Sequence, residues 1–319
     1  MIVLANDGIS PSGEEKLKEY GYEVITNHIP QDQLITYINE NKVAAIAVRS
    51  ATTVRKDLID ACPSLKFIGR GGVGMDNIDV DYAREKGLTV NNTPAASSQS
   101  VAELVIAQML SISRFTHLAN REMPEMGASE FKVLKKKYAK GVELRGKTLG
   151  IVGFGRIGQS LAKYALGCGM KVIAADNKPV PSTIEIEFHN GQKIDVAIEG
   201  GTAEEVYAAS DYISLHIPKQ ANGSAVINEA ELALMKNGVR LINAARGGVI
   251  DEDALLKAIE TGKIAYCALD VFENEPNPRQ DLLVNTKITA TPHIGAATLE
   301  AQDRIGIELA ERINDCLSG

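Results

Sequence analysis

The chain has 319 residues, of which 45% are hydrophobic and 24% charged, a composition typical of globular rather than disordered proteins. This length predicts two domains. With 34 Lys and Arg against 41 Asp and Glu, the formal net charge is −7, which argues against a surface built for nucleic acids or anionic membranes. An anionic substrate therefore needs cations that are placed locally.

The sequence carries no targeting, membrane or metal signal. Only Ile2–Ala5 is apolar before Asp7, which is too short for a signal peptide, and charged and polar residues interrupt the apolar stretch Val101–Leu118. The four cysteines show no metal-ligand or disulfide spacing, which favours buried thiols in a reducing compartment. We expect a cytoplasmic protein without a metal site.

The first ninety residues alternate between short apolar runs and segments of helical composition. This alternation is the signature of a parallel sheet with helices on both faces. The predicted strands are Ile2–Ala5, Tyr22–Thr26, Val43–Val48, Leu65–Ile68 and Leu88–Val90, and the predicted helices are Glu14–Tyr20, Gln31–Asn39, Arg55–Ala61 and Val80–Lys86.

A long apolar helix and a polar arm are predicted next. Over Ser97–Leu118 the apolar positions go nearly all the way round a helix, so this helix must be buried on more than one side, between two domains or two subunits. The stretch Asn120–Lys140, which includes Lys135, Lys136 and Lys137, is polar and is interpreted as a connecting arm.

A second alternation starts at Thr148 and predicts six more strands. A capping-box spacing at Thr202 and a capping Asp251 predict two of the intervening helices. These helices are Val206–Ser210 and Ala254–Glu260, a last amphipathic helix is Leu299–Leu317, and the strands are Leu149–Val152, Lys171–Ala174, Tyr212–Leu215, Val239–Ile242, Ala265–Leu269 and Lys287–Ala290.

One segment departs from this plan. Apolar residues alternate on both sides of Asn190-Gly191, which predicts a β-hairpin over residues 183–198. Apart from this insertion, the chain is expected to be an α/β protein of two doubly wound parallel-sheet domains, Rossmann-like and flavodoxin-like, with a cleft between them.

Gly153, Gly155 and Gly158 form a G-x-G-x-x-G motif between the strand Leu149–Val152 and a predicted helix. The first glycine permits a tight turn, the second lets a diphosphate approach the backbone, and the third permits close packing of helix on strand. Asp176, at the end of the next strand, can accept hydrogen bonds from the adenosine ribose and repel a 2′-phosphate. The sequence therefore predicts NAD rather than NADP.

Three polar residues of the second half, Arg246, Glu275 and His293, each follow a predicted strand. Because the carboxyl ends of parallel strands share one edge, we expect these side chains to converge there. A guanidinium can hold a carboxylate or carbonyl, an imidazole can exchange a proton, and a carboxylate can orient that imidazole.

With Ser214–Pro218, Asn243–Asp251, Asp270–Pro276 and Thr291–Ala296, these motifs make the whole chain resemble the D-isomer-specific 2-hydroxyacid dehydrogenase family. The resemblance implies that Arg246 clamps the substrate, that Glu275 pairs with the imidazole, and that His293 is the acid/base. The residues that it implies or we expect to line the NAD site, besides the glycines and Asp176, are Arg156, Ile157, His216, Pro218, Ala244, Asp270 and Gly295.

The resemblance also implies a discontinuous layout. A substrate-binding domain is expected over 1–95 plus 290–319 and an NAD-binding Rossmann domain over 96–289, through which two copies form a homodimer. Lys135–Lys137 matches a basic arm that in some members reaches the partner subunit's site. Longer members carry a regulatory domain after the last helix, so we expect no feedback through such a domain here.

Substrate choice rests on Arg49 and on the glycine-rich loop headed by Arg70, which follow strands at one sheet edge. Two arginines beside the amides of Gly72, Val73 and Gly74 predict a second anionic group on the substrate, for which phosphate is the natural candidate. Here the resemblance is strongest to family members that oxidise 3-phospho-D-glycerate, whose arginines at these positions contact the phosphate.

Two alternatives stay open at this stage. Another D-2-hydroxy acid, such as glycerate, hydroxypyruvate or lactate, would not need both Arg49 and Arg70. An NAD-sensing binding protein, as in corepressors that share this fold, would keep similar site residues. The absence of a low-complexity partner segment favours the enzyme.

Overall fold

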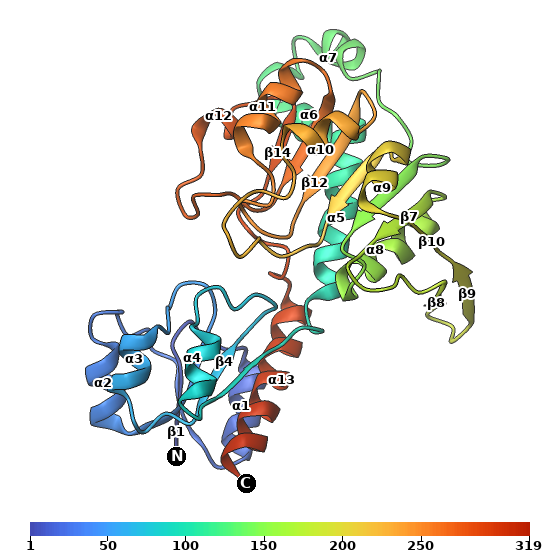
Figure 1. Ribbon diagram of the computed structural model, residues 1–319. Helices are drawn as coiled ribbons and strands as arrows, with labels where there is room; N and C mark the ends of the chain where they lie inside the picture. The colour runs from blue at the N-terminus through green and yellow to red at the C-terminus, as the bar shows by residue number, and fades with distance from the viewer. The chain divides into compact units, whose positions relative to one another are not determined.

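Two parallel β-sheets, each accompanied by helices, organise the chain, which the computed structural model describes over residues 1–319 (Figure 1). Unit 1 consists of Met1–Ser100 and Ala296–Gly319, and unit 2 consists of Val101–Gly295. Each boundary lies a few residues further along the chain than the division at 95/96 and 289/290 expected from the sequence. The doubly wound α/β class is confirmed.

Unit 1 contains a sheet of five parallel strands. The strands are β1 (Ile2–Ala5), β2 (Glu23–Ile25), β3 (Val43–Val48), β4 (Phe67–Arg70) and β5 (Thr89–Asn92), and the helices are α1 (Pro11–Glu19), α2 (Leu34–Asn41), α3 (Lys56–Ala61), α4 (Val80–Glu85) and α13 (Leu299–Leu317). Their order, β2-β1-β3-β4-β5, is that of flavodoxin-like folds. The central strand β3 is buried along its whole length, as its uninterrupted apolar sequence requires.

Helix α13, the last helix of the chain, packs against α1 in unit 1 (Figure 1). The two helices touch at Gly13 and Gly306, since a Cβ on Gly13 would lie within 3 Å of the Gly306 backbone. Leu309 and Ile313 of α13 join Phe67 of β4 in the same buried cluster. The last helix therefore completes the core of unit 1.

Unit 2 contains a sheet of seven parallel strands. The strands are β6 (Thr148–Val152), β7 (Lys171–Ala175), β10 (Glu199–Gly200), β11 (Tyr212–Leu215), β12 (Val239–Asn243), β13 (Ile264–Leu269) and β14 (Ile288–Ala290), and the helices with them are α5 (Ser98–Arg114), α8 (Arg156–Gly167), α9 (Ala203–Ala209), α10 (Glu229–Leu234), α11 (Glu252–Glu260) and α12 (Gln280–Leu283). Their order, β10-β7-β6-β11-β12-β13-β14, is the Rossmann order with one further strand. The direction of winding reverses between β6 and β11, and nucleotides bind at such a switch point.

The segment expected as a polar connecting arm is helical. It forms α6 (Thr116–Met126) and α7 (Phe131–Lys137), while the preceding helix ends at Arg114 rather than Leu118. Between them Phe115 adopts a left-handed φ of 59° and packs against Tyr138 and Tyr266. Burial of this aromatic ring overrides the continuous helical pattern that the sequence shows.

The predicted hairpin is confirmed as the antiparallel pair β8 (Thr183–Glu187) and β9 (Lys193–Ala197). Its turn is longer than a two-residue Asn-Gly turn, because Phe188 pairs with Gln192 and Gly191 alone has a left-handed φ, 81°. Ile184 is buried at the base, whereas Phe188 is 46% exposed at the tip.

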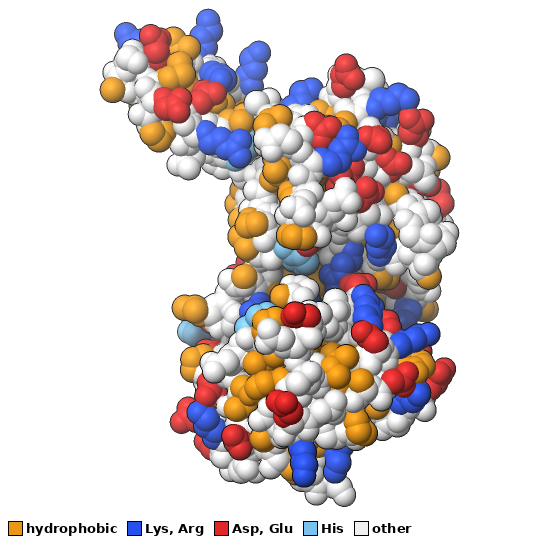
Figure 2. Space-filling model, turned by 90° about the vertical axis from the view of Figure 1, so that its left-hand side faces the viewer, with side chains coloured by type: hydrophobic (Ala, Val, Ile, Leu, Met, Phe, Trp, Pro, Cys, Tyr) orange, Lys and Arg blue, Asp and Glu red, His pale blue; other side chains and the backbone are white.

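Positive and negative side chains are interspersed over the face shown in Figure 2, without a continuous basic patch. None of the helices combines the length with the apolar character needed to cross a bilayer.

We expect Gly13→Ala to destabilise unit 1 by about 1–3 kcal/mol, because the new Cβ overlaps the Gly306 backbone, which cannot rotate away. Urea-induced unfolding followed by circular dichroism measures this change. Gly167→Ala is the control: no atom lies within 4 Å of its added Cβ, so stability should stay the same or rise slightly. Equal effects of the two variants would contradict the close helix contact.

Candidate active site

The glycine motif joins β6 to α8, and each of its three glycines has a different environment. A Cβ on Gly153 would lie within 3 Å of the His216 carbonyl, and one on Gly158 within 3 Å of the Gly153 carbonyl oxygen. Nothing lies within 4 Å of a Cβ on Gly155. The first and third glycines are therefore required by the protein's own packing, while the second leaves open space at the start of α8, as a bound diphosphate requires.

Asp176 follows β7 and faces the same loop. Its Oδ2 accepts a hydrogen bond from the Phe154 amide at 2.6 Å, and its Oδ1 accepts one from the Lys178 amide at 2.9 Å. The side chain is exposed, so the remaining lone pairs are accessible to ribose hydroxyls. The residues present here fit NAD.

His216 follows β11, across the switch point from the glycine loop. Its Nε2 is hydrogen-bonded to Ser214 Oγ at 2.9 Å, while its Nδ1 is buried and has no partner within the protein. Burial lowers the pKa of His216 to about 4, so this imidazole is neutral at pH 7. An uncharged ring with one unpartnered nitrogen suits contact with a ligand better than proton exchange.

Asp270 follows β13 and is fully buried. Its Oδ1 accepts hydrogen bonds from Thr291 Oγ1 at 2.6 Å and the Ile294 amide at 2.9 Å, and its Oδ2 accepts one from the Gly295 amide at 2.9 Å. Its backbone carbonyl accepts a bond from the His293 amide at 2.9 Å. Asp270 thus fixes the segment that carries His293, and its contact with nicotinamide stays a prediction.

His293 and Glu275 form a hydrogen-bonded pair, with 2.7 Å between Nδ1 and Oε2. The other carboxylate oxygen, Oε1, accepts a bond from the Phe272 amide at 2.9 Å. This anchoring fixes the imidazole by one nitrogen and leaves Nε2 without a protein partner. The arrangement is that of an oriented proton acceptor.

Electrostatics keep Glu275 ionised. Burial acts to raise the pKa of this carboxyl, but hydrogen bonds from His293 and Phe272 and the charges of His293 and Arg246 bring its pKa below the ordinary value. A carboxylate in this state stabilises the imidazolium that forms when His293 takes up a proton.

Arg246 follows β12 in a turn that Asn243 braces. Asn243 Nδ2 donates to the Arg246 carbonyl at 2.9 Å, and Arg246 Nη1 donates to the Ala245 carbonyl at 2.6 Å. Its guanidinium lies near enough to Glu275 to lower the pKa of that carboxyl. The structure therefore brings the three expected residues together at the carboxyl edge of the sheet, as a cation beside an acid–base pair.

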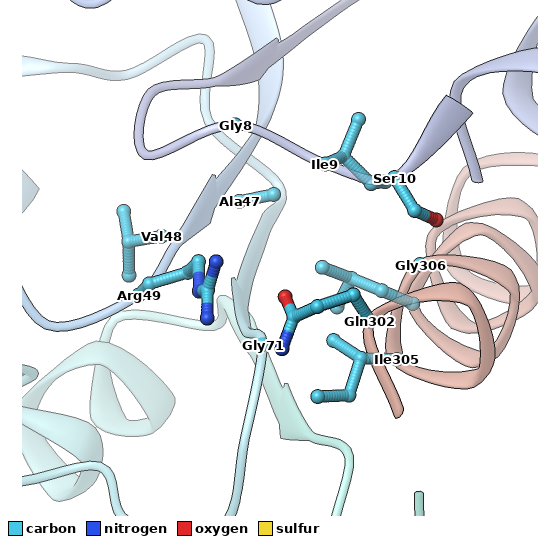
Figure 3. A pocket seen from close by; sticks show the side chains of 11 residues that line it. Gly8, Ile9, Ser10, Ala47, Val48, Arg49, Gly71, Gln302, Ile305 and Gly306 are labelled. Atoms are coloured by element: carbon cyan, nitrogen blue, oxygen red, sulfur yellow. The ribbon is translucent and has the colours of Figure 1, made fainter. Parts of the chain in front are cut away.

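In unit 1, Arg49 follows β3 and lines a pocket (Figure 3). Its amide donates to Asp7 Oδ2 at 2.6 Å and its carbonyl accepts from Asn77 Nδ2 at 2.8 Å, so its backbone is fixed. The guanidinium makes no hydrogen bond or ion pair within the protein. The other lining residues are Gly8, Ile9, Ser10, Ala47, Val48, Gly71, Gln302, Ile305, Gly306 and Leu309.

Arg70 ends β4 and folds over the glycine loop, where its Nη1 donates to the Gly71 carbonyl. The Gly72 amide donates to Thr93 Oγ1 at 2.8 Å and is therefore engaged, unlike the open amide expected from the sequence. The amides of Val73 and Gly74 make no hydrogen bond within the protein. Two of the three amides expected to bind an anion are accessible for that task.

Sequence reasoning missed Gln302. This residue of α13 faces Arg49 across the pocket (Figure 3), and its Nε2 donates to the Ala296 carbonyl at 2.7 Å. No local motif marks it, because it reaches the pocket only through the packing of α13 onto the sheet of unit 1.

Comparisons with known proteins agree with this geometry. The sequence profile described as "D-isomer specific 2-hydroxyacid dehydrogenase, NAD binding domain" matches residues 106–295. A hydroxypyruvate reductase of Thermotoga maritima is 45% identical over 91% of this chain and 90% of its own length. A D-3-phosphoglycerate dehydrogenase of Methanocaldococcus jannaschii is 39% identical over 99% of this chain, which spans only 57% of that relative. The crystal structure of the Aquifex aeolicus D-lactate dehydrogenase with NAD and lactic acid has a TM-score of 0.79 and 30% identity, covering 100% of this chain and 96% of the other.

We expect Gly155→Val to weaken NADH binding at least tenfold, or about 1.4 kcal/mol, without lowering thermal stability. The added Cβ meets no protein atom within 4 Å, and the branched side chain occupies the space beside the start of α8. Fluorescence titration with NADH and a thermal melt provide the two measurements, with Gly167→Ala as a control. Unchanged NADH affinity would show that the diphosphate does not approach Gly155.

Proposed function

The chain belongs to the D-isomer-specific 2-hydroxyacid dehydrogenase family, and we propose that its substrate is 3-phospho-D-glycerate. We propose that it oxidises this substrate to 3-phosphohydroxypyruvate with NAD. Membership in the family accounts for the reaction type and for the NAD-binding domain. The phosphorylated substrate and the roles of individual residues are our inference from the site.

The observation that carries the proposal is the Arg49 guanidinium, which lines a pocket and has no partner within the protein. Arg70 and the accessible amides of Val73 and Gly74 belong to the neighbouring loop, since a Cβ on Gly71 would lie 3.6 Å from Arg49 Cγ. Guanidinium forks and clustered amides recognise phosphate oxygens. A 2-hydroxy acid with a single carboxylate, held by Arg246, would leave the Arg49 guanidinium without a group to bind.

The chemistry follows from the second group of residues. Arg246 holds the substrate carboxylate, and His293 Nε2 accepts the proton of the C2 hydroxyl. Glu275 stabilises the resulting imidazolium through its bond to Nδ1. NAD, when bound, supplies the acceptor for the hydride that leaves C2, so that the C–H and O–H bonds break as the C=O bond forms.

The remaining assignments concern the cofactor. We assign Gly153, Gly155 and Gly158, with the amides of Arg156 and Ile157, to the diphosphate, and Asp176 to the adenosine ribose. The residues assigned to the nicotinamide half are His216, Pro218, Ala244, Asp270 and Gly295.

A second candidate is hydroxypyruvate reduction, which is favoured by the relative of that name because it matches almost its full length. Hydroxypyruvate has no phosphate, so Arg49 would contribute little to its binding. The two substrates therefore predict different behaviour of the same variant.

We further propose a homodimer formed through unit 2. The helices α6 and α7 expose a set of large apolar side chains, which is unusual for a surface in contact with water alone. The last turn of α7 carries the basic run Lys135–Lys137, of which Lys137 is bound to Glu122 at 2.6 Å. We propose that Lys135 and Lys136 contact the partner subunit. The exposed apolar residues are Met123 (44%), Met126 (37%), Phe131 (57%) and Val133 (53%).

We expect Arg49→Ala to lower kcat/KM for the phosphorylated substrate about 10- to 100-fold, because a charge-assisted hydrogen bond contributes about 1.5–3 kcal/mol. Arg70→Ala should act in the same direction. For hydroxypyruvate both variants should stay within about threefold of wild type. A spectrophotometric NADH assay with paired phosphorylated and unphosphorylated acids measures the ratio.

Arg312→Ala removes a charge elsewhere on unit 1 and serves as the control. If wild type prefers hydroxypyruvate to its phosphate ester, the second candidate replaces the first. Equal losses on both substrates would remove Arg49 from phosphate recognition.

His293→Ala should reduce kcat by about 10²–10⁴-fold while NADH still binds, because the variant lacks the proton acceptor but keeps the glycine loop. Steady-state kinetics and NADH titration test the two parts separately. His189→Ala, on the exposed hairpin, should behave as wild type. Turnover within a few-fold of wild type in His293→Ala would exclude His293 as the acid/base.

A further inference from the structure

Glu252, the first residue of α11, is a buried acid that the proposed reaction does not use. It is only 6% exposed, its Oε1 accepts a hydrogen bond from the Glu273 amide at 2.9 Å, and its Oε2 is buried without a partner. Burial raises the pKa of this carboxyl. Burying a carboxyl group is unfavourable, so its hydrogen bond to the Glu273 amide indicates its role.

The amide that Glu252 holds belongs to the peptide unit between Phe272 and Glu273. The carbonyl side of this unit lies against Gly247, where a Cβ would come within 3 Å of both carbonyl atoms of Phe272. The peptide plane is therefore fixed on one side by the loop that carries Arg246 and on the other by the start of α11. Rotation of this plane requires breaking the bond to Glu252.

Phe272 connects this fixed peptide unit to the pair of Glu275 and His293. Its own amide donates to Glu275 Oε1 at 2.9 Å, and Glu275 Oε2 in turn lies 2.7 Å from His293 Nδ1. The Phe272 amide belongs to the preceding peptide unit and shares the Phe272 α-carbon with the unit that Glu252 holds, so a displacement of that α-carbon moves the amide away from Glu275. The carboxylate then loses the anchor that holds it beside the imidazole.

We propose that Glu252 is a positioning residue: it holds the peptide unit between Phe272 and Glu273 so that Glu275 stays paired with His293. The inference rests on the proposed function, in which His293 takes up the proton. It also explains why a carboxylate is retained where an apolar residue would cost less to bury.

Several charged groups surround the carboxyl groups of Glu252 and Glu275 and influence their ionisation. Glu273, Arg279 and Asp281 act on Glu252, and Arg279 is bound to Asp253 and Asp281 at 2.6 and 2.8 Å. His293 faces Glu275, which Arg246 also approaches. Variants of Glu252 leave all of these partners in place.

The test compares Glu252→Ala, Glu252→Gln and Glu275→Gln in the pH dependence of kcat/KM for oxidation. Loss of a paired carboxylate lowers the pKa of an imidazole, so Glu275→Gln should move the acid limb to lower pH. Glu252→Ala should move it in the same direction and reduce kcat/KM about tenfold, or about 1.4 kcal/mol. Glu252→Gln keeps an oxygen for the Glu273 amide and should stay within about threefold of wild type.

A double-mutant cycle separates positioning from a general structural effect. If Glu252 acts through Glu275, the double variant Glu252→Ala/Glu275→Gln should resemble Glu275→Gln alone, whereas independent effects add. Glu260→Gln, an exposed acid at the end of the same helix, is the matched control and should change nothing. Should Glu252→Ala not fold, Glu252→Asp shortens the reach to Glu273 while keeping the charge and should give the same shift.

The outcomes also separate this inference from the function beneath it. Retained turnover in His293→Ala overturns the proposed function. If His293→Ala is inactive but Glu252→Ala leaves the acid limb in place, or adds fully to Glu275→Gln, the positioning role alone is overturned.

Discussion

The buried carboxylate of Asp270 holds in place the segment of unit 2 that carries His293. It accepts hydrogen bonds from Thr291, Ile294 and Gly295, and the backbone carbonyl of Asp270 accepts the His293 amide. Removing a carboxylate from water is unfavourable unless such bonds replace the hydration. The same network keeps His293 at a left-handed φ of 54°, which a residue other than glycine adopts only when its surroundings impose it.

Close backbone contacts join loops that follow different strands into one sheet edge. The Gly153 backbone lies against the His216 carbonyl, and Gly247 lies against the Phe272 carbonyl. A backbone neighbour cannot rotate away as a side chain can, so any side chain at these positions would displace a loop. Gly155 differs, because open space surrounds it. The packing that makes the edge rigid thus leaves room where the family binds its cofactor.

Under the proposed function, selectivity among 2-hydroxy acids would depend on Arg49 of unit 1. The set of Arg246, Glu275 and His293 can serve any substrate with a carboxylate beside a secondary hydroxyl. Arg49, by contrast, lies in a pocket whose wall includes Gln302 of α13 (Figure 3). Under the same proposal, changes confined to this pocket would alter the preferred substrate and leave Arg246, Glu275 and His293 in place.

The amino-acid sequence by itself determined the fold class, most strands and the residues at the sheet edges. Periodicity and capping residues act within one or two turns, which is why Val43–Val48, Tyr212–Leu215 and Leu299–Leu317 match the predicted bounds. The same local signals include a capping box at Asn228 that marks α10 and that sequence reasoning overlooked. Phe115, buried against aromatic rings, broke a helix that local pattern continued.

Only the tertiary structure decided which polar groups are already engaged and which are free. The Gly72 amide is taken by Thr93, the Asp270 carboxylate by the His293 segment, and the Glu252 carboxylate by Glu273. Each of these bonds joins residues that follow different strands, so no local window of sequence contains both partners. A buried polar group takes whichever partner the packed backbone brings within reach, and that partner exists only once the sheet has formed.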